Sequence, residues 1–525
     1  MKNLIILLIL KFWDRIVVSE RLKQYTYKRL AFEIVNLSTM LDTLKVHQMS
    51  IALIANNSFN WIVVYLTALI KGIPITIISS KYDLDRKIKF IHDSRAKILF
   101  GGVETFYNFK RTSNIIYYVD IETFNLEYVN WEMVQKSIKK INKWDSLLNI
   151  EVKDRNITPE LFKKFKDKKD KLNKENQFLT STYSSGVDGL PTAEYSSETT
   201  ILRAMKGMTK HLGKSELRRK PILVNADFSF FNAITFLPIM GTGGEIILST
   251  SNISNEETSA CICDTQWYEA MWSYLAEIMS EKNRMYYERW WITKWINTIY
   301  LKKRFKEHFG ENFKHFIILN DETHSYLKKN LQRMGYEVSS TYGTNATSQL
   351  ISINDMLIKN MEIKINSKHP SKVPGKVFAS ILIGSTNFTS WSDTGDIGHI
   401  GKNSKLVLHG RKESIIETLN GSKIYTETIE KVVNSHPFVN QCFVFQKNDK
   451  LLIGVNFHNF ALDIRGITKA EAVNILKEVK NDINNGLPEG VEIDNVVLLP
   501  RELPVNEQGK IIKFYYRHTP SEVFE

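Results

Sequence analysis

Apolar strand patterns alternate with an amphipathic helix pattern between residues 48 and 100, and this order constrains the fold more than any other feature. Ile51–Ala55, Ile75–Ile78 and Lys97–Phe100 are short apolar runs of strand length. The Asn-Asn-Ser segment after the first run offers side chains that cap a helix. Because strands that alternate with helices form parallel sheets, the sequence predicts an α/β fold.

The same pattern returns at Pro221–Val224, Glu245–Leu248 and Phe316–Leu319, so the amino-terminal part should contain several subdomains. Beyond residue 413, shorter strands and one helix predict a smaller unit of about a hundred residues. Its expected elements are strands at 443–445 and 452–455 and a helix at 469–484. We therefore expect a large α/β domain over residues 1–412 and a small, mobile α+β domain over residues 413–525.

Charge and cysteine content narrow the classes of partner and compartment. Lys and Arg total 70 against 57 Asp and Glu, a net charge of +13 that favours nucleotides, lipid headgroups or nucleic acid as partners. No RNA or DNA motif occurs in the sequence, so nucleic acid is not expected. Three cysteines give neither a disulfide framework nor a four-ligand metal pattern, which favours a cytoplasmic protein. The apolar run Leu4–Leu10 is too short to span a bilayer and predicts a buried first helix.

Five segments carry side chains suited to binding or transferring a phosphorylated group. A loop rich in Ser and Gly can turn backbone N–H groups onto phosphate, and an aromatic ring can stack on a base. A carboxylate can accept both ribose hydroxyls, and a lysine on a turn can bridge two anions. Each segment alone also fits an ordinary loop or turn. In chain order the candidate residues are Ser184, Ser185, Gly186, Asp188 and Gly189; Tyr342, Gly343, Thr344 and Asn345; Asp396; Arg411; and Lys510.

Taken in this order, the segments resemble the adenylate-forming superfamily of acyl-CoA synthetases, luciferases and peptide-synthetase adenylation domains, over nearly the whole chain. The family's Thr-Ser-Gly-Thr-Thr-Gly-x-Pro-Lys-Gly phosphate loop aligns with Ser184–Ala193. Its Tyr-Gly-x-Thr-Glu and Thr-Gly-Asp segments align with Tyr342–Ala346 and Thr394–Asp396. Its Gly-Arg-x-Asp hinge aligns with Gly410–Glu413, and its Pro-x-Thr-x-x-Gly-Lys turn aligns with Pro504–Lys510.

The resemblance implies a reaction in two steps. A carboxylate attacks the α-phosphate of Mg-ATP to give acyl-AMP and pyrophosphate, and a thiol usually then takes the acyl group. The small domain would pivot at Glu413 between these steps. Lys510 would neutralise the attacking carboxylate and the phosphate during the first step.

The resemblance also implies a role for each nucleotide-binding candidate. Tyr342 would stack on adenine and Asp396 would hold the ribose. Arg411 would assist at the ribose or a phosphate. The amide of Asn345 or the hydroxyl of Thr344 would contact the α-phosphate.

The chain departs from the family pattern at the positions that would contact the phosphates and magnesium. Thr192 replaces the phosphate-loop lysine, Val187 and Asp188 replace two threonines, and Ala346 replaces the glutamate that helps to hold magnesium. Under one interpretation Asp188 takes over magnesium binding and the enzyme is active. Under the other, ATP chemistry is weakened and the chain is a binding paralogue. Because Lys510 is retained, together with the ribose carboxylate and the hinge arginine, we favour the active enzyme.

Two segments bear on the substrate. Asp227 suits an amino-acid substrate, since amino-acid-activating relatives pair an acidic residue with the α-ammonium. Phe228, Phe230 and Phe231 better suit an apolar acyl chain, although an aromatic helix face packed in the core would read the same way. Residues 282–306 form a basic, aromatic pattern that fits either a membrane-surface helix or a half-buried helix.

The sequence therefore predicts an AMP-forming acyl-CoA ligase that adenylates a fatty or other apolar carboxylic acid with ATP and Mg²⁺ and transfers it to coenzyme A. The first alternative is amino- or aryl-acid adenylation for the thiol of a separate carrier protein. The second is a catalytically weakened protein that binds acyl groups or nucleotides. We expect a cytoplasmic location, with peripheral membrane contact as a further possibility.

Overall fold

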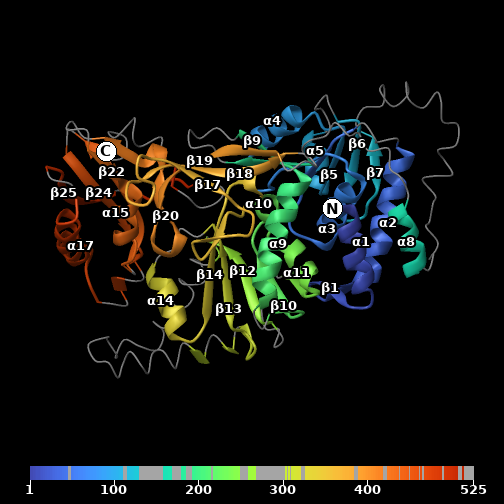
Figure 1. Ribbon diagram of the computed structural model, residues 1–525, viewed down its shortest axis with the longest axis horizontal. Coiled ribbons are helices and arrows are strands. Elements are labelled where there is room, and N and C mark those ends of the chain that lie inside the picture. The colour runs from blue at the N-terminus through green and yellow to red at the C-terminus, as the bar shows by residue number, and fades with distance from the viewer. Residues whose placement is uncertain are drawn as a thin grey trace.

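The computed structural model describes residues 1–44, 49–109, 115–128, 158–167, 179–184, 192–214, 217–248, 258–265, 267, 302–303, 306–307, 309–320, 325–383, 388–417, 422–436, 438–447, 450–459, 462–463, 466–487, 490–499, 501–505 and 511–512. Figure 1 shows the amino-terminal elements on the right, the largest sheet in the centre and the carboxyl-terminal elements on the left.

One sheet contains the strands predicted between residues 48 and 100. Among the described residues it has seven strands in the order β7-β6-β5-β3-β4-β8-β9. The five inner strands run parallel, and β7 and β9 pair antiparallel at the edges. The predicted parallel sheet is confirmed. The bounds are β3 (Ile51–Ile54), β4 (Ile75–Ile77), β5 (Ile98–Gly101), β6 (Tyr117–Asp120), β7 (Leu126–Tyr128), β8 (Thr180–Ser184) and β9 (Thr192–Ser196).

A second sheet has nine strands in the described part of the chain, in the order β16-β15-β14-β13-β12-β10-β11-β1-β2. The six strands from β14 to β1 run parallel, so their carboxyl ends meet along one edge. The bounds are β1 (Ile16–Glu20), β2 (Lys23–Thr26), β10 (Pro221–Asn225), β11 (Glu245–Leu248), β12 (Ala260–Asp264), β13 (His315–Leu319), β14 (Glu337–Tyr342), β15 (Ser352–Ile353) and β16 (Met356–Leu357).

Helices cover these two sheets, and α3 is buried around nearly its whole circumference. Its amino terminus is capped as predicted, since the Ser58 hydroxyl accepts a hydrogen bond of 3.1 Å from the N–H of Trp61. The Trp61 ring packs on Phe228 and Phe236 from the second sheet's helices. The bounds are α1 (Lys2–Lys11), α2 (Tyr27–Thr43), α3 (Phe59–Lys71), α4 (Leu84–Ser94), α5 (Val103–Phe109), α8 (Pro159–Asp167), α9 (Glu198–Lys214), α10 (Phe228–Phe231), α11 (Phe236–Thr242) and α14 (Ser325–Arg333).

The apolar amino-terminal run forms the buried helix that its length predicts. In α1, Ile5, Ile6, Leu8 and Ile9 are buried in the main core. Within the described ranges, every helix falls short of the length and hydrophobicity that a bilayer span requires.

A four-stranded antiparallel sheet follows, in the order β17-β18-β19-β20. Figure 1 shows it above the second sheet, toward the carboxyl-terminal elements. The bounds are β17 (Ile363–Asn366), β18 (Gly375–Ile383), β19 (Phe388–Ile400) and β20 (Leu406–Arg411), with short 3₁₀ turns η2 (Asn345–Thr347), η3 (Lys402–Ser404) and η4 (Lys412–Ser414).

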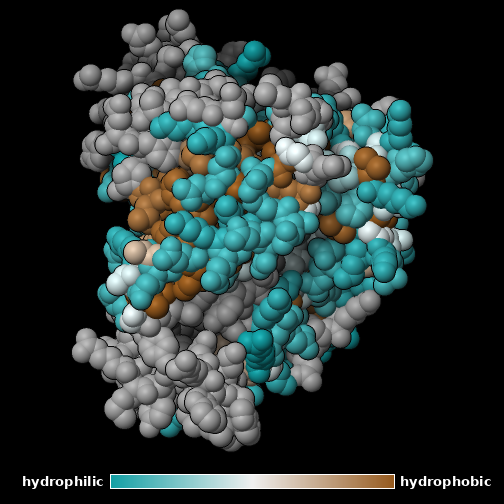
Figure 2. Space-filling view, turned by 90° about the vertical axis from the view of Figure 1, so that its left-hand side faces the viewer, coloured by the Kyte–Doolittle hydropathy of each residue, from teal (hydrophilic) through white to brown (hydrophobic). Residues whose placement is uncertain are grey.

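The carboxyl-terminal elements form a small α+β domain with its own apolar core, which includes Val444, Ile453 and Leu476. The predicted helix at 469–484 is observed with those bounds. The face formed by this domain is mostly hydrophilic, with apolar areas between the polar side chains (Figure 2). The bounds are β21 (Ile415–Glu417), β22 (Lys423–Tyr425), β23 (Val439–Lys447), β24 (Lys450–Phe457), β25 (Ile493–Leu498), α15 (Thr426–Val433) and α17 (Lys469–Asn484). The predicted mixed α/β class is confirmed.

Acid should destabilise the second sheet through His315 of β13. Burial, followed by the charge of His211, lowers the pKa of His315 from 6.5 to about 4. Its ring also faces the Ser339 hydroxyl at 2.8 Å and the Glu337 carboxylate at 3.4 Å. Between pH 6.5 and 4 the unfolded chain binds the proton more tightly than the folded chain does. The free energy of unfolding therefore decreases as the pH is lowered, by about 2 kcal/mol at pH 5 relative to pH 7. Urea unfolding at pH 7 and 5 should show this loss in the wild type and a smaller one in His315→Gln; equal losses would contradict it.

Candidate nucleotide site

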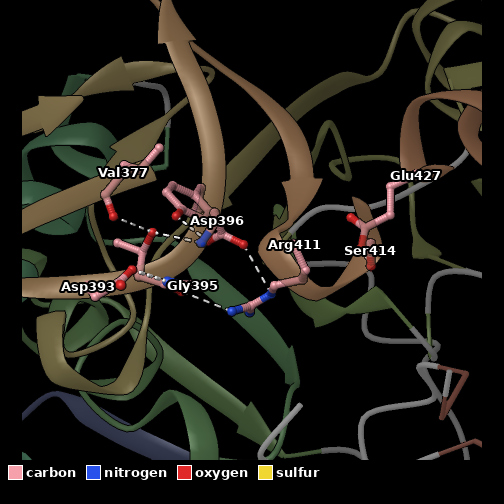
Figure 3. A network of polar contacts seen from close by, with 9 residues as sticks. Val377, Asp393, Gly395, Asp396, Arg411, Ser414 and Glu427 are labelled. Atoms are coloured by element: carbon pink, nitrogen blue, oxygen red, sulfur yellow. Dashed lines mark hydrogen bonds and ion pairs between the residues drawn. The ribbon is translucent and has the colours of Figure 1, made fainter. Parts of the chain in front are cut away.

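Three of the predicted site residues meet at one buried carboxylate. Asp396 on β19 is the register partner of Arg411 on β20, and Nε of Arg411 lies 3.0 Å from Oδ1 of Asp396. Tyr342, at the end of β14, donates its hydroxyl to Oδ2 of the same carboxylate. Figure 3 shows Arg411 reaching back across the sheet toward Asp396. The ion pair and the tyrosine fix the carboxylate between the second sheet and the four-stranded sheet.

A tight turn before Asp396 holds this arrangement. Gly395 has φ +74°, a left-handed conformation that favours glycine, and a Cβ there would lie 3.1 Å from Nη1 of Arg411. Nη1 of Arg411 donates to the Thr394 carbonyl at 2.9 Å. The Thr394 hydroxyl accepts from the N–H of Asp396 and donates to the Val377 carbonyl. The glycine of the Thr-Gly-Asp segment therefore lets the guanidinium approach the backbone.

The phenol of Tyr342 stays protonated and acts as a hydrogen-bond donor. Burial first, and then the charge of Asp396 with its hydrogen bond, raises the pKa of Tyr342 well above its ordinary value of 10. The phenol is therefore neutral at physiological pH and can donate its proton to the carboxylate.

The segment after Tyr342 is folded tightly. A Cβ on Gly343 would lie 2.2 Å from the carbonyl carbon of Gln349, so the position requires glycine. Oδ1 of Asn345 accepts a hydrogen bond from Gln349, whose own amide oxygen accepts from Asn320 at 2.8 Å. Thr344 and Thr347 form a reciprocal cap around η2. Gln349 and Asn320 belong to none of the motifs, and no sequence signal identified them.

The predicted phosphate loop joins β8 to β9. Ser184 is the last residue of β8, whereas Ser185, Gly186, Asp188 and Gly189 lie outside the described residues. Directly after the aligned loop, Glu194 of β9 accepts a hydrogen bond of 2.9 Å from the backbone N–H of Ala346. Glu194 was not among the residues predicted from the sequence, although its position one residue beyond the loop was a usable signal.

The predicted hinge lies between two firmly bonded residues. On one side Arg411 is held by Asp396. On the other, the buried hydroxyl of Ser414 donates to Glu427 at 2.6 Å, and the Ser414 carbonyl accepts from Thr426 at 2.8 Å. Lys412 and Glu413 are the two residues between these anchors, and Glu413 is exposed. Figure 3 shows Arg411 and the Ser414–Glu427 pair on opposite sides of this short segment.

Lys510 lies outside the described residues, but the base of its turn is described. Val505 and Ile511 form an antiparallel bridge, so residues 506–510 connect two paired positions. The Gln441 side chain on β23 donates to the Leu503 carbonyl at 3.0 Å and accepts from the Leu503 N–H at 2.7 Å. The described residue Leu503, ahead of this segment, is thus hydrogen-bonded to the small domain.

The candidate acyl-pocket residues pack inside the protein. Phe228, Phe230 and Phe231 are all at most 4% exposed. Phe228 packs on Trp61 at 5.2 Å between ring centres, which fits a core role. Asp227 caps α10 through one oxygen and accepts from the Ser79 hydroxyl at 2.9 Å through the other. Most of the basic aromatic segment at 282–306 lies outside the described residues.

The family model of the AMP-binding enzyme matches residues 10–368. The chain belongs to the AMP-binding enzyme family. No curated protein sequence matches it.

Solved structures share its fold over almost the whole length at low identity. The anthranilate CoA ligase AuaEII in complex with anthranoyl-AMP has a TM-score of 0.71 and 12% identity, covering 98% of this chain and 96% of the ligase. O-succinylbenzoate coenzyme A synthetase from Bacillus subtilis, in complex with AMP, has a TM-score of 0.67 and 14% identity, covering 98% and 97%. ATP-bound MatB from Rhodopseudomonas palustris has a TM-score of 0.70 and 13% identity, covering 100% of both chains. These similarities establish the adenylate-forming ligase fold with a small carboxyl-terminal domain.

Proposed function

We propose that the protein is an AMP-forming acid–thiol ligase that adenylates an apolar carboxylic acid with ATP and transfers it to coenzyme A. The observation that carries this proposal is the buried Asp396 carboxylate held between Arg411 and Tyr342. A carboxylate can accept several hydrogen bonds at once, so one held in a fixed orientation suits contacts with ribose hydroxyls. Membership of the AMP-binding enzyme family supplies the expected ligand.

In this proposal residues on three strands divide the task of nucleotide binding. Tyr342 presents its ring to the adenine while its hydroxyl stays on Asp396. Arg411 orients the carboxylate and neutralises part of its charge. Magnesium, when bound, screens the charge of the triphosphate. Among the described residues, the carboxylate of Glu194 would hold it, because oxygen ligands suit this ion.

Lys510 would supply the charge that the first step needs. The attacking carboxylate and the α-phosphate are both anionic, and an ammonium between them lowers the energy of their approach. We propose that the domain boundary lies between residues 412 and 413 and that Lys412 and Glu413 form the pivot. The contacts of Arg411 with Asp396 and of Ser414 with Glu427, on either side of these two residues, support this proposal.

The acid is proposed to be apolar because the described surroundings of α10 are aromatic. Tyr82 packs edge-on against Phe230 at 6.2 Å between ring centres and donates its hydroxyl to the Tyr183 carbonyl. Asp227 caps α10 with one oxygen and accepts from Ser79 with the other, which supports a structural role for this carboxylate. Similar structures are named for anthranilate, o-succinylbenzoate and benzoate, so an aryl acid belongs in the same test.

A panel of carboxylic acids tests the proposal. It should include fatty, aryl and amino acids, each assayed for AMP release with and without coenzyme A. Release that requires both an apolar acid and coenzyme A is the expected result. Release with acid alone would indicate hydrolysis of the acyl-adenylate by water and would contradict coenzyme A as the required acceptor.

A catalytically weakened binding protein is the second candidate. Thr192 and Ala346 favour it, since a phosphate-loop cation and a magnesium ligand of the family pattern are both absent. ATP binding without AMP release for any acid would support this candidate.

A further inference from the structure

Glu194 places a carboxylate where the family pattern has lost one. Its Oε2 accepts a hydrogen bond of 2.9 Å from the backbone N–H of Ala346, the position that aligns with the missing glutamate. We propose that Glu194 replaces that glutamate and holds Mg²⁺ at the phosphates of the bound nucleotide. This inference rests on the proposed function, because it needs a nucleotide in the site.

The strand register supports this assignment. Side chains alternate along β9, so Thr192, Glu194 and Ser196 project from the same face. The Ser196 hydroxyl donates to the Asn345 carbonyl at 3.0 Å, so two successive side chains of this face contact the 345–346 segment. Thr192 occupies the aligned position of the phosphate-loop lysine. Glu194 therefore lies between the end of the phosphate loop and the segment that follows Tyr342.

The chemistry of the carboxylate also fits a metal ligand. Glu194 is half-buried, and its Oε1 accepts no hydrogen bond from any residue that the structure describes. The bond to Ala346 orients the carboxylate while leaving the second oxygen for an ion, an arrangement that is common around metal ligands. Mg²⁺ is usually bound through one or two carboxylates together with phosphate oxygens. One carboxylate from β9 restores the acidic group without restoring the glutamate at position 346.

Glu194→Gln tests the role because the amide oxygen can still accept from Ala346 while the charge is removed. ATP binding should be measured by calorimetry in EDTA and across a Mg²⁺ titration, and Mn²⁺ binding to the protein–ATP complex by electron paramagnetic resonance. We expect the Mg²⁺ midpoint and the Mn²⁺ dissociation constant to rise about ten- to a hundredfold. Metal-free ATP should bind equally well or more tightly, because an anion beside the triphosphate is gone.

If Glu194 has a purely structural role, a different result is expected. Its substitution would then disturb the nucleotide site itself and reduce ATP affinity equally with and without metal. That result, or a Mg²⁺ midpoint within about twofold of the wild type, would overturn the proposal. Ala346→Glu added to Glu194→Gln should restore metal binding by returning the family's carboxylate. Glu337→Gln, at the opposite end of β14, is the matched control and should leave the midpoint unchanged.

Asp188→Asn separates the rival ligand from Glu194. If only this variant shifts the Mg²⁺ midpoint, Asp188 is the ligand and the inference about Glu194 is wrong. The binding measurements do not depend on the acid or the thiol. A protein that binds Mg-ATP through Glu194 but releases no AMP with any acid would refute the ligase function alone.

Discussion

Lys510→Ala should reduce acid-dependent ATP–pyrophosphate exchange at least about a hundredfold while leaving ATP affinity within about threefold of the wild type. Loss of a group that stabilises developing negative charge typically has an effect of this size on the chemical step. The residues proposed to hold adenine and ribose lie on β14 and β19, whereas Lys510 follows the small domain's last described strand. Exchange and calorimetry on the same preparation would separate the two quantities.

Lys513→Ala is the matched control, because it removes an equal charge three residues further along. It should retain exchange within about threefold. If Lys510→Ala retained wild-type exchange, the proposed role of this turn would be wrong. A fall in ATP affinity as large as the fall in exchange would indicate a role in binding.

Asp396→Asn should weaken ATP binding about a hundredfold. Two hydrogen bonds from ribose hydroxyls to a charged acceptor contribute roughly 1.5–3 kcal/mol each, and 1.4 kcal/mol corresponds to a factor of ten in affinity. The amide would also turn a donor toward Tyr342 or Arg411, which now donate to the carboxylate. Loss of the ion pair with Arg411 should also lower the free energy of unfolding. Because Arg411 is partly exposed and water screens the pair, we expect this loss to be about 1–3 kcal/mol. Calorimetry and urea unfolding measure the two effects.

Asp393→Asn provides the control on the same strand. Asp393 is exposed, and its Oδ1 accepts from the Gly395 N–H at 2.9 Å, a bond that an amide oxygen preserves. Its ATP affinity should stay within about twofold of the wild type. Equal losses in the two variants would show that the turn, and not the Asp396 carboxylate, determines nucleotide binding.

Local sequence patterns predicted the elements that carry the site. The strands at 51, 75 and 98, the cap at Ser58 and the helix at 469–484 all follow from short-range periodicity and capping chemistry. Tyr342, Asp396 and Arg411 were identified from motif order, and the structure brings their side chains together. The roles of these residues, the hinge and the domain boundary stay predictions.

The aromatic segment at 228–231 shows a limit of the pattern. A run of phenylalanines fits an acyl pocket and a packed core equally well. The pattern indicates that the side chains are buried, but it does not show whether a substrate or other side chains cover them. Packing of Phe228 on Trp61 resolves the question for that ring in favour of the core. The sequence likewise did not show that both oxygens of Asp227 are occupied by Ser229 and Ser79.

By itself, the sequence determined the α/β class, the chain order of the motifs and the family, because these depend on neighbouring residues and their spacing. Only the tertiary structure decided that Glu194 faces Ala346 and that Tyr342 and Arg411 share one carboxylate. Glu194 and Ala346 are 152 positions apart, and their contact depends on how β9 packs against η2. No local pattern encodes such a contact, since a strand's alternation fixes which face a side chain takes but not what that face meets.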